Sequence, residues 1–264
     1  FLILFLWLYS KKFLTGMPLL FYLFYPSLLL YSSLSLKDPL VLSFMTIGTI
    51  FLIEQKYIKF IMIISPLLLM KFQTFFFMII LFGIFFIFKK RLTYKINYLL
   101  IGLVIFCSFL FIDDIIHALN HYRVGFWVEN NKISHNTHDM DGYIPLDKSF
   151  SLIAHSFFAF FSFLLMPLPW EASNFLQRIQ SIENIFVVFS LIVFIKKAYN
   201  QNVLVATKWI LFLVTTFTIH GLVVFNEGTA ARFRYPFIVI FVIGLAYELY
   251  KVNGYRFGGI LKKK

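Results

Sequence analysis

Two arginines near the end of the chain have the type and the spacing to bind a phosphate group. Arg232 and Arg234 lie in the stretch FNEGTAARFRYPF, which separates two long apolar runs. A guanidinium group stays charged at any relevant pH and matches phosphate oxygens with paired hydrogen bonds. Tyr235 precedes Pro236, and a residue before proline favours an extended backbone. The sequence therefore predicts an extended segment over 231–235, in which both guanidinium groups point to the same side.

Neighbouring residues in this stretch favour the same anion site. Pro236 suits the first turn of a helix, and the start of a helix carries partial positive charge. Gly228 allows a close approach of the backbone, and Asn226 and Thr229 are further candidates for pyrophosphate binding. A simpler interpretation is also open, in which the arginines only anchor the loop to lipid headgroups.

Three acidic residues are candidates for catalysis. Asp113 and Asp114 end an apolar run, where a carboxylate could accept the proton of an acceptor hydroxyl group. As plain helix-end charges they would only mark a membrane interface. Glu171 follows PLPW and lies two helical turns before Arg178, which favours a role at the substrate. An acid near a helix start is also stabilising by itself.

The histidines give weaker indications of a functional site than the arginines and acidic residues do. The stretch HNTHDMD holds two histidines and two aspartates: His135, His138, Asp139 and Asp141. Such residues can ligate a divalent metal, but they are also ordinary in a solvated loop, and we predict neither a metal site nor another cofactor. His155 and His220 lie in apolar runs, and we expect both to be buried packing residues with a hydrogen bond.

Composition indicates that these residues are positioned by membrane helices. Of 264 residues, 60% are hydrophobic, only 14% are charged and 37 are Phe, whereas a soluble domain has roughly 25% charged residues. We predict an all-α fold, a polytopic helical transmembrane bundle of about 8–10 membrane segments, some short or re-entrant. The apolar segments are 1–9, 13–35, 39–53, 57–70, 74–88, 96–112, 149–166, 183–195, 203–225 and 235–250.

Charge and cysteine content exclude some classes of protein. The net charge is +12, but the basic residues cluster at the ends of apolar runs, which is typical of membrane orientation and argues against nucleic-acid binding. The single cysteine, Cys107, cannot form an internal disulfide. The chain starts with FLILFLWLYS and no Met, so we interpret residues 1–264 as one transmembrane domain with a truncated N-terminus.

The basic clusters predict an orientation. If Lys11 and Lys12 face the cytoplasm, then 54–59 and 89–95 face it as well, and the polar stretch 113–148 is an extracytoplasmic loop. The short segments 57–70 and 74–88 form either a tight hairpin around KFQ or one longer helix that is kinked near a proline.

The next basic cluster, Lys196–Lys197, requires that one of the intervening segments does not cross. We favour a re-entrant or interfacial 149–182 region, because Pro167 and Pro169 interrupt helical continuity. The alternative is that 149–166 spans and 183–195 is the partial element.

Several of these stretches resemble a known group of proteins. PSLLLYSSLSLKDPL (26–40), PLPWE (167–171) with IEN (182–184), and NEGTAARFRYP (226–236) are similar to patterns in O-antigen polymerases and multi-spanning glycosyltransferases that use polyprenyl-linked donors. The resemblance covers about residues 13–250. It implies a helical fold in the bacterial cytoplasmic (inner) membrane, an extracytoplasmic active site and a saccharide carried on undecaprenyl pyrophosphate.

The resemblance also implies roles for single residues. In such polymerases outward-facing arginines engage the pyrophosphate, which corresponds here to Arg232 and Arg234. In the multi-spanning transferases an early outer-loop aspartate is the base, and the first visible loop here offers only Asp38, beside Lys37.

Three functions remain open from the sequence. The first is an enzyme, a glycosyltransferase or polysaccharide polymerase in which arginines neutralise the pyrophosphate leaving group. The second is a transporter or flippase, a class that usually carries charges at mid-membrane, whereas here such charges are nearly absent apart from Lys208 and Lys71. The third is a membrane scaffold. The expected partners are the lipid-linked saccharide, membrane lipids and polysaccharide-assembly proteins.

Overall fold

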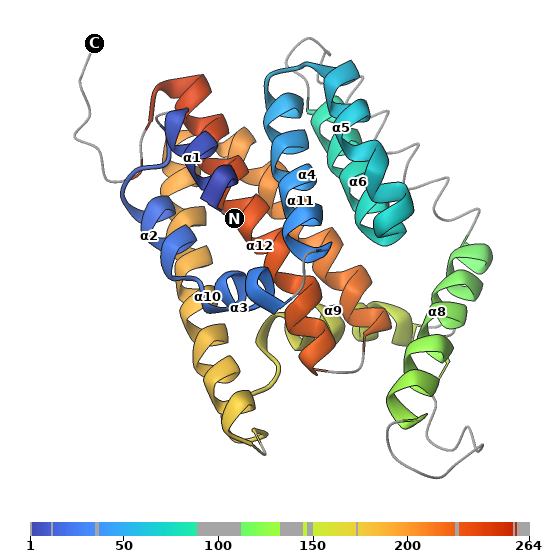
Figure 1. Ribbon diagram of the computed structural model, residues 1–264. Helices are drawn as coiled ribbons and strands as arrows, with labels where there is room; N and C mark the ends of the chain where they lie inside the picture. The colour runs from blue at the N-terminus through green and yellow to red at the C-terminus, as the bar shows by residue number, and fades with distance from the viewer. Residues whose placement is uncertain are drawn as a thin grey trace. The chain divides into compact units, whose positions relative to one another are not determined.

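A computed structural model describes residues 2–11, 13–34, 37–88, 112–132, 145–146, 150–172, 174–224, 227–255 and 257. Within these ranges the regular structure is helical, with no strand, which confirms the all-α prediction (Figure 1). The helices are α1 (Leu2–Ser10), α2 (Met17–Phe24), α3 (Pro26–Leu34), α4 (Lys37–Ile53), α5 (Tyr57–Met70), α6 (Phe72–Ile87), α8 (Ile112–Lys132), α9 (Phe150–Leu165), α10 (Phe175–Gln201), α11 (Val203–Val223) and α12 (Glu227–Asn253).

Three helices in the described part of the chain are long and apolar enough to cross a membrane. They are Phe175–Gln201, Val203–Val223 and Gly228–Asn253. Helices α5 and α6 are apolar but shorter than the roughly 20 residues of a perpendicular span. The protein therefore has the helices of a membrane protein, while the larger number of crossings stays a prediction.

The chain folds into two compact units. Unit 1 comprises Phe1–Phe88, Phe189–Leu213 and Tyr235–Lys264. Unit 2 comprises Lys89–Val188 and Val214–Arg234. Helices α10, α11 and α12 each contribute residues to both units.

Helix α12 forms the core of unit 1. Every residue of this helix from Tyr235 to Leu249 is buried, as expected for a helix that is apolar on all sides. Aromatic rings from separate elements pack against it. The centroid of Phe77 in α6 lies 5.3 Å from that of Phe237, and Tyr31 in α3 stacks on Tyr235 at 5.2 Å.

Helices α4, α5 and α6 pack on one another in unit 1 (Figure 1). Helices α5 and α6 meet at Lys71, whose backbone (φ −157°, ψ 81°) is not helical. Of the two alternatives for 57–88, the hairpin is therefore confirmed, and Pro66 stays inside α5.

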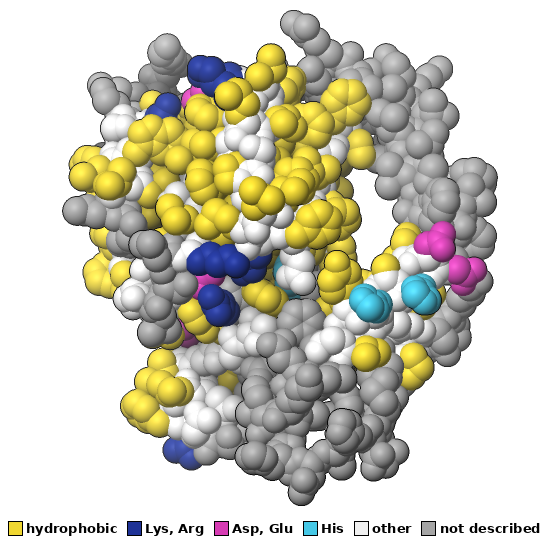
Figure 2. All heavy atoms as spheres, turned by 45° about the vertical axis from the view of Figure 1, so that its right-hand side comes forward, with side chains coloured by type: hydrophobic (Ala, Val, Ile, Leu, Met, Phe, Trp, Pro, Cys, Tyr) yellow, Lys and Arg dark blue, Asp and Glu magenta, His cyan; other side chains and the backbone are white. Residues whose placement is uncertain are grey.

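Much of the surface is apolar. Figure 2 shows a broad field of hydrophobic side chains with Lys and Arg at its margins. Ile58, Met62, Leu69 and Phe72 from α5 and α6 are among the exposed apolar side chains. Such an exterior suits a lipid environment better than water.

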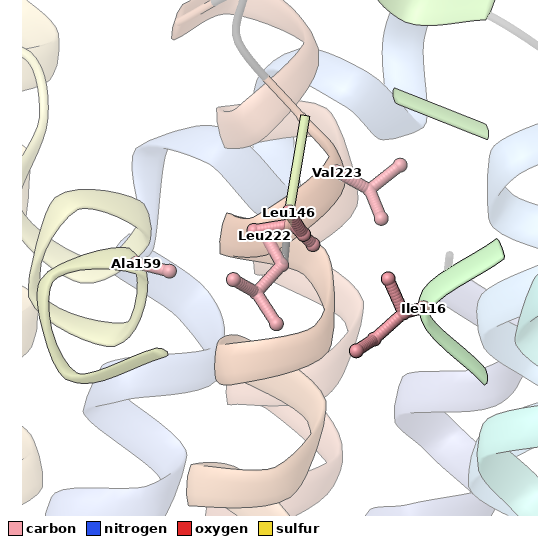
Figure 3. Close-up of a cluster of buried hydrophobic side chains, with 5 residues drawn as sticks. All are labelled: Ile116, Leu146, Ala159, Leu222 and Val223. Atoms are coloured by element: carbon pink, nitrogen blue, oxygen red, sulfur yellow. The ribbon is translucent and has the colours of Figure 1, made fainter. Parts of the chain in front are cut away.

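Unit 2 is built around a small apolar cluster where α8, α9 and α11 meet (Figure 3). Its buried members are Ile116, Leu146, Ala159, Leu222 and Val223. Residues 113–132, which the sequence analysis assigned to the extracytoplasmic loop 113–148, are helical and belong to α8. Its inner side chains explain the difference, because contacts with the rest of unit 2 stabilise a helix whose sequence is otherwise polar.

Helix α9 ends at Leu165, before the two prolines of PLPWE, as their effect on helical continuity predicted. The following turn starts with a cis Met166–Pro167 bond, and α10 then runs unbroken from Phe175 to Gln201. The segment 183–195 is therefore part of a 27-residue helix and not a short partial element. That 149–182 does not cross the membrane stays a prediction.

Candidate functional site

The site residues predicted from the sequence and described by the structure all belong to unit 2. They are Asp113, Asp114, Glu171, Thr229, Arg232 and Arg234. Asn226 lies outside the described residues, and so do the members of HNTHDMD.

The predicted geometry of the two arginines is wrong. Residues 231–235 belong to helix α12 and are not extended, and Pro236 lies inside the helix instead of in its first turn. A proline removes one backbone hydrogen bond, but neighbouring groups can compensate within membrane helices. Side chains two residues apart do not share a helix face. Accordingly Arg232 is exposed, whereas Arg234 is only 2% exposed.

Arg234 binds the end of helix α9. Its Nη1 donates hydrogen bonds to the carbonyl oxygens of Phe163 (2.8 Å) and Leu164 (2.7 Å), with a longer contact to that of Met166 (3.4 Å). Its Nη2 donates to the side-chain oxygen of Asn184 in α10. The last carbonyl groups of a helix have no partner within the helix and carry partial negative charge, so a guanidinium group is well suited to cap them.

Asn184 closes the same network from the other side. Its Nδ2 donates to the carbonyl oxygens of Leu165 (2.8 Å) and Met166 (3.0 Å), while its Oδ1 accepts from Arg234. We call Arg234, Asn184 and the carbonyl groups of 163–166 the arginine–carbonyl network. It joins IEN (182–184) and NEGTAARFRYP (226–236) at the residues that directly precede PLPWE (167–171).

Helix α10 presents a polar stripe to the interior of unit 2. Gln177, Gln180, Ser181 and Asn184 follow the spacing of one helix face, and the last two are buried. The other faces carry exposed apolar side chains, including Ile182. The Oγ atom of Ser181 is buried and has no hydrogen-bond partner among the described residues. Polar residues inside and apolar residues outside are the arrangement that lipid requires.

Glu171 lies in the turn between α9 and α10. Its Oε2 accepts a hydrogen bond from the backbone N–H of Leu168 at 3.3 Å, and its side chain is exposed. Trp170 beside it is 78% exposed, as expected for a residue at a membrane interface. The carboxylate can therefore be reached from outside the unit.

Helix α8 docks through groups that the sequence did not single out. Arg123 is buried and donates to the carbonyl oxygen of Leu222 near the end of α11. Asn120 donates to the carbonyl oxygen of Leu146 (3.0 Å) and accepts from its N–H (2.8 Å). Ile116, Asn120 and Arg123 recur at helical spacing, so this pattern was the signal for the helix. Asp113 and Asp114 occupy its first turn and are exposed.

Instead of two arginines, one helix face at the start of α12 presents Arg232 together with Gly228 and Thr229. Gly228 and Thr229 lie four and three residues before Arg232, so they share its helix face. Gly228 and Arg232 are exposed and Thr229 is half-buried. A guanidinium group, a hydroxyl group and the N–H groups of a helix start are all donors suited to phosphate.

His155 and His220, both expected to be buried, differ in their exposure to solvent. His220 is buried, contacts the carbonyl oxygen of Thr216 through Nδ1 (2.9 Å) and stacks on Phe163 at 5.3 Å, which confirms its packing role. His155 is exposed, so the expectation of burial is wrong there, because it falls on the outer face of α9.

Unit 1 contains a buried ion pair between Lys208 and Glu248, of which the sequence analysis identified only Lys208. Lys208 in α11 pairs with Glu248 in α12, and each is 6% exposed. The Nε1 of Trp209 donates to the other carboxylate oxygen of Glu248 at 2.8 Å, and the Lys208 ammonium lies 4.3 Å from the ring centre of Phe85. Glu248 was not identified because the sequence ELYK (248–251) is typical of the end of a membrane span. Its partner becomes evident only from the packing of α11 on α12.

The ion pair sits where α11 and α12 approach closely. A Cβ atom on Gly244 would lie 2.1 Å from the Trp209 ring, so glycine is needed for the indole to reach Glu248. The indole hydrogen bond and the ammonium group together satisfy both carboxylate oxygens. Buried charges are tolerated under these conditions.

A second polar cluster forms around Glu54, in the turn between α4 and α5. The Tyr247 hydroxyl donates to Glu54 Oε1 at 2.7 Å, and the Lys11 ammonium lies 3.6 Å from the same oxygen. Burial by itself would raise the pKa of Glu54, but hydrogen bonds from Lys56 and Tyr247 and the charges of Lys11 and Lys56 lower that pKa to about 2. Lys11 and Lys56, from two separate basic clusters of the sequence, thus meet at Glu54.

The site, as far as the structure describes it, shows neither an enclosed metal site nor a match to known proteins. Among the described side chains, no group of three or more His, Cys, Asp or Glu residues is close enough to enclose a metal ion. Comparison of the chain with models of protein families, with curated protein sequences and with solved structures gives no match.

Proposed function

We propose that the protein is a membrane enzyme of cell-envelope polysaccharide biosynthesis. It transfers or polymerises undecaprenyl-pyrophosphate-linked sugars at the extracytoplasmic face of the bacterial cytoplasmic membrane. The observation that carries this proposal is the arginine–carbonyl network, because it holds together the segments whose sequences resemble O-antigen polymerases and related glycosyltransferases. The apolar exterior and the polar stripe of α10 support a membrane location for this chemistry.

The residues of unit 2 take separate roles in this proposal. Arg232 and Thr229 bind the pyrophosphate of the donor, and Arg234 positions α12 by capping α9. Glu171 is the first candidate for the general base, and Asp113 and Asp114 are the alternatives.

The reaction balances without a covalent protein intermediate. An acceptor hydroxyl oxygen attacks the anomeric carbon of the donor sugar, and its proton passes to the carboxylate. The bond from that carbon to the pyrophosphate oxygen breaks, so undecaprenyl pyrophosphate leaves with the bonding electrons. The Arg232 guanidinium group stabilises the charge that develops on this leaving group.

Reconstitution tests the proposal. Purified protein in liposomes that contain an undecaprenyl-pyrophosphate-linked oligosaccharide should produce longer lipid-linked chains and free undecaprenyl pyrophosphate, both measured by mass spectrometry. Arg232→Ala should lower the rate about tenfold to a hundredfold, which corresponds to one charge-assisted contact. Lys251→Ala, which removes an exposed basic side chain of unit 1, is the control. Failure of the wild-type protein to form either product would exclude this enzyme.

The buried Lys208–Glu248 pair favours a second candidate, a transporter of the same lipid-linked saccharide. Ionisable residues within membrane helices often mark transport pathways, and both residues lie in candidate spans. In the same liposomes, a fluorescent lipid-linked saccharide would then move between leaflets without any change in its mass.

A further inference from the structure

Helix α8 has an inner and an outer face, and its docking contacts fix which is which. Ile116, Asn120 and Arg123 lie on the inner face, where Asn120 makes two hydrogen bonds to Leu146 and Arg123 bonds to Leu222. These contacts fix the rotation of the helix, so its exposed side chains cannot turn into the core without breaking them.

The outer face carries two imidazole and two carboxylate groups. Asp113, Asp114, His117 and His121 are all exposed. At about 100° per residue, their four positions fall within an arc of about 100° around the helix axis. Figure 2 shows histidine and acidic side chains close to one another on this helix.

We propose that His117 and His121 bind a divalent transition-metal ion of the Zn²⁺, Cu²⁺ or Ni²⁺ type. Residues four apart on a helix are neighbours, with about 5–6 Å between their Cβ atoms, and imidazole is a preferred ligand of these metals. Helical zinc sites use the same His-x-x-x-His spacing. Asp113 and Asp114 lie about one helical turn before His117, so they add negative charge beside it.

The site is open and holds the metal through two protein nitrogens. No set of three described side chains encloses a metal, so water fills the remaining coordination positions, as at metals with exchangeable ligands. This metal binding goes beyond the proposed function, in which α8 supplies only the alternative bases Asp113 and Asp114. It is measured without any saccharide substrate.

The alternative is that these histidines are simply solvated, and the two ideas differ in their dependence on spacing. Two solvated histidines would bind metal weakly and separately. A chelating pair binds more tightly because the second contact is intramolecular, which strengthens binding by roughly 10²–10⁴-fold. The spacing can be destroyed while the number of histidines is kept, since Ala118 is also exposed on α8.

The experiment is a Zn²⁺ titration of the full chain in detergent, purified without a polyhistidine tag and followed by calorimetry. The wild-type chain should show one site that His117→Ala and His121→Ala each weaken about 100-fold or more. The register variant Ala118→His/His121→Ala, which keeps six histidines in total, should be equally weak. Circular dichroism checks that α8 remains helical in each variant.

Two further measurements make the result decisive. Electron paramagnetic resonance of bound Cu²⁺ should show two imidazole nitrogens in the wild-type chain and one in either single variant. The double variant His135→Ala/His138→Ala should keep full affinity. Unchanged binding by the register variant, loss of binding on removal of His135 and His138, or no wild-type site above background would each overturn the proposal.

Discussion

Units 1 and 2 each bury a basic side chain between helices, and they satisfy it in opposite ways. In unit 1 the Lys208 ammonium meets the carboxylate of Glu248, so two formal charges cancel. In unit 2 the Arg234 guanidinium group meets carbonyl groups and the amide of Asn184, which are neutral dipoles. A point charge suits a single anion, whereas the planar fork of arginine can satisfy several acceptors at once.

The difference predicts how each unit responds to loss of a partner. An ion pair that loses one member leaves an uncompensated charge in the interior, which is costly. A cap that loses its arginine leaves polar but uncharged carbonyl groups, which costs less. Unit 1 should therefore be more sensitive to changes of charge, and unit 2 more sensitive to changes of shape.

The largest effect is expected at the ion pair. Glu248→Leu should lower the free energy of unfolding by about 3–5 kcal/mol, because Lys208 stays buried without its anion. The double variant Lys208→Met/Glu248→Leu should recover most of this loss. Unfolding in mixed detergent and SDS micelles measures both, with the exposed Lys251→Met on the same helix as control. A double variant as unstable as the single one would show that packing, and not charge, holds this contact.

A smaller loss of stability is expected when the planar guanidinium group of Arg234 is replaced by the ammonium group of lysine. Arg234→Lys keeps the charge but cannot reach the carbonyl groups of α9 and Asn184 together, so the free energy of unfolding should fall by about 1.5–3 kcal/mol. Arg232→Lys, two residues away and exposed, is the control and should change stability little. A double-mutant cycle with Asn184→Ala should give a coupling energy of about 0.5–3 kcal/mol. Additive losses would mean that the two side chains act separately.

Close helix contacts offer a test of shape in each unit. A Cβ atom on Gly221 would lie 2.0 Å from the backbone oxygen of Ala159, and one on Gly244 would strike the Trp209 ring. Gly221→Ala and Gly244→Ala should each cost about 1–3 kcal/mol, with the larger loss at Gly221 because backbone yields less than a side chain. Gly83→Ala, with nothing within 4 Å, should be neutral or slightly stabilising. The reverse order in a thermal melt would contradict this comparison.

The smallest effect is the dependence of unit 1 on pH through Glu54. Its pKa in the folded protein is about 2, below the ordinary value of 4.5. The carboxylate therefore stabilises the fold fully above about pH 4.5, and this contribution is lost as the pH falls toward 2. Thermal melts from pH 7 to pH 3 should show a decline that Glu54→Gln reduces. An identical decline in both proteins would assign the acid sensitivity to other groups.

The sequence correctly located several of the apolar helices, but the segment 13–35 contains two helices, α2 and α3. Apolar runs at 203–225 and 39–53 correspond to α11 and α4, because long apolar runs can be stable in lipid only as helices. The prolines at 167 and 169 correctly predicted the end of α9. The same rule failed at Pro236, where packing against the rest of the protein stabilises a helix that local preference disfavours.

The sequence identified residues of the candidate site, but it did not predict how they are arranged. Arg234 was identified by type, but its partners come from segments 50 and about 70 residues earlier in the chain. Helix α8 was missed because its sequence is polar. The helical spacing of Ile116, Asn120 and Arg123 was the available signal, but two of these three side chains are polar, so they do not form an apolar stripe.

By itself, the sequence determined that the chain is helical and apolar, and where most of its helices lie, because these properties depend on local composition and periodicity. Only the tertiary structure decided which charges are neutralised. It paired Lys208 with Glu248, and it turned Arg234 inward and Arg232 outward. The physical reason is that a buried charge needs a partner, and the partner comes from whichever helix packs beside it, however far away it lies in the chain.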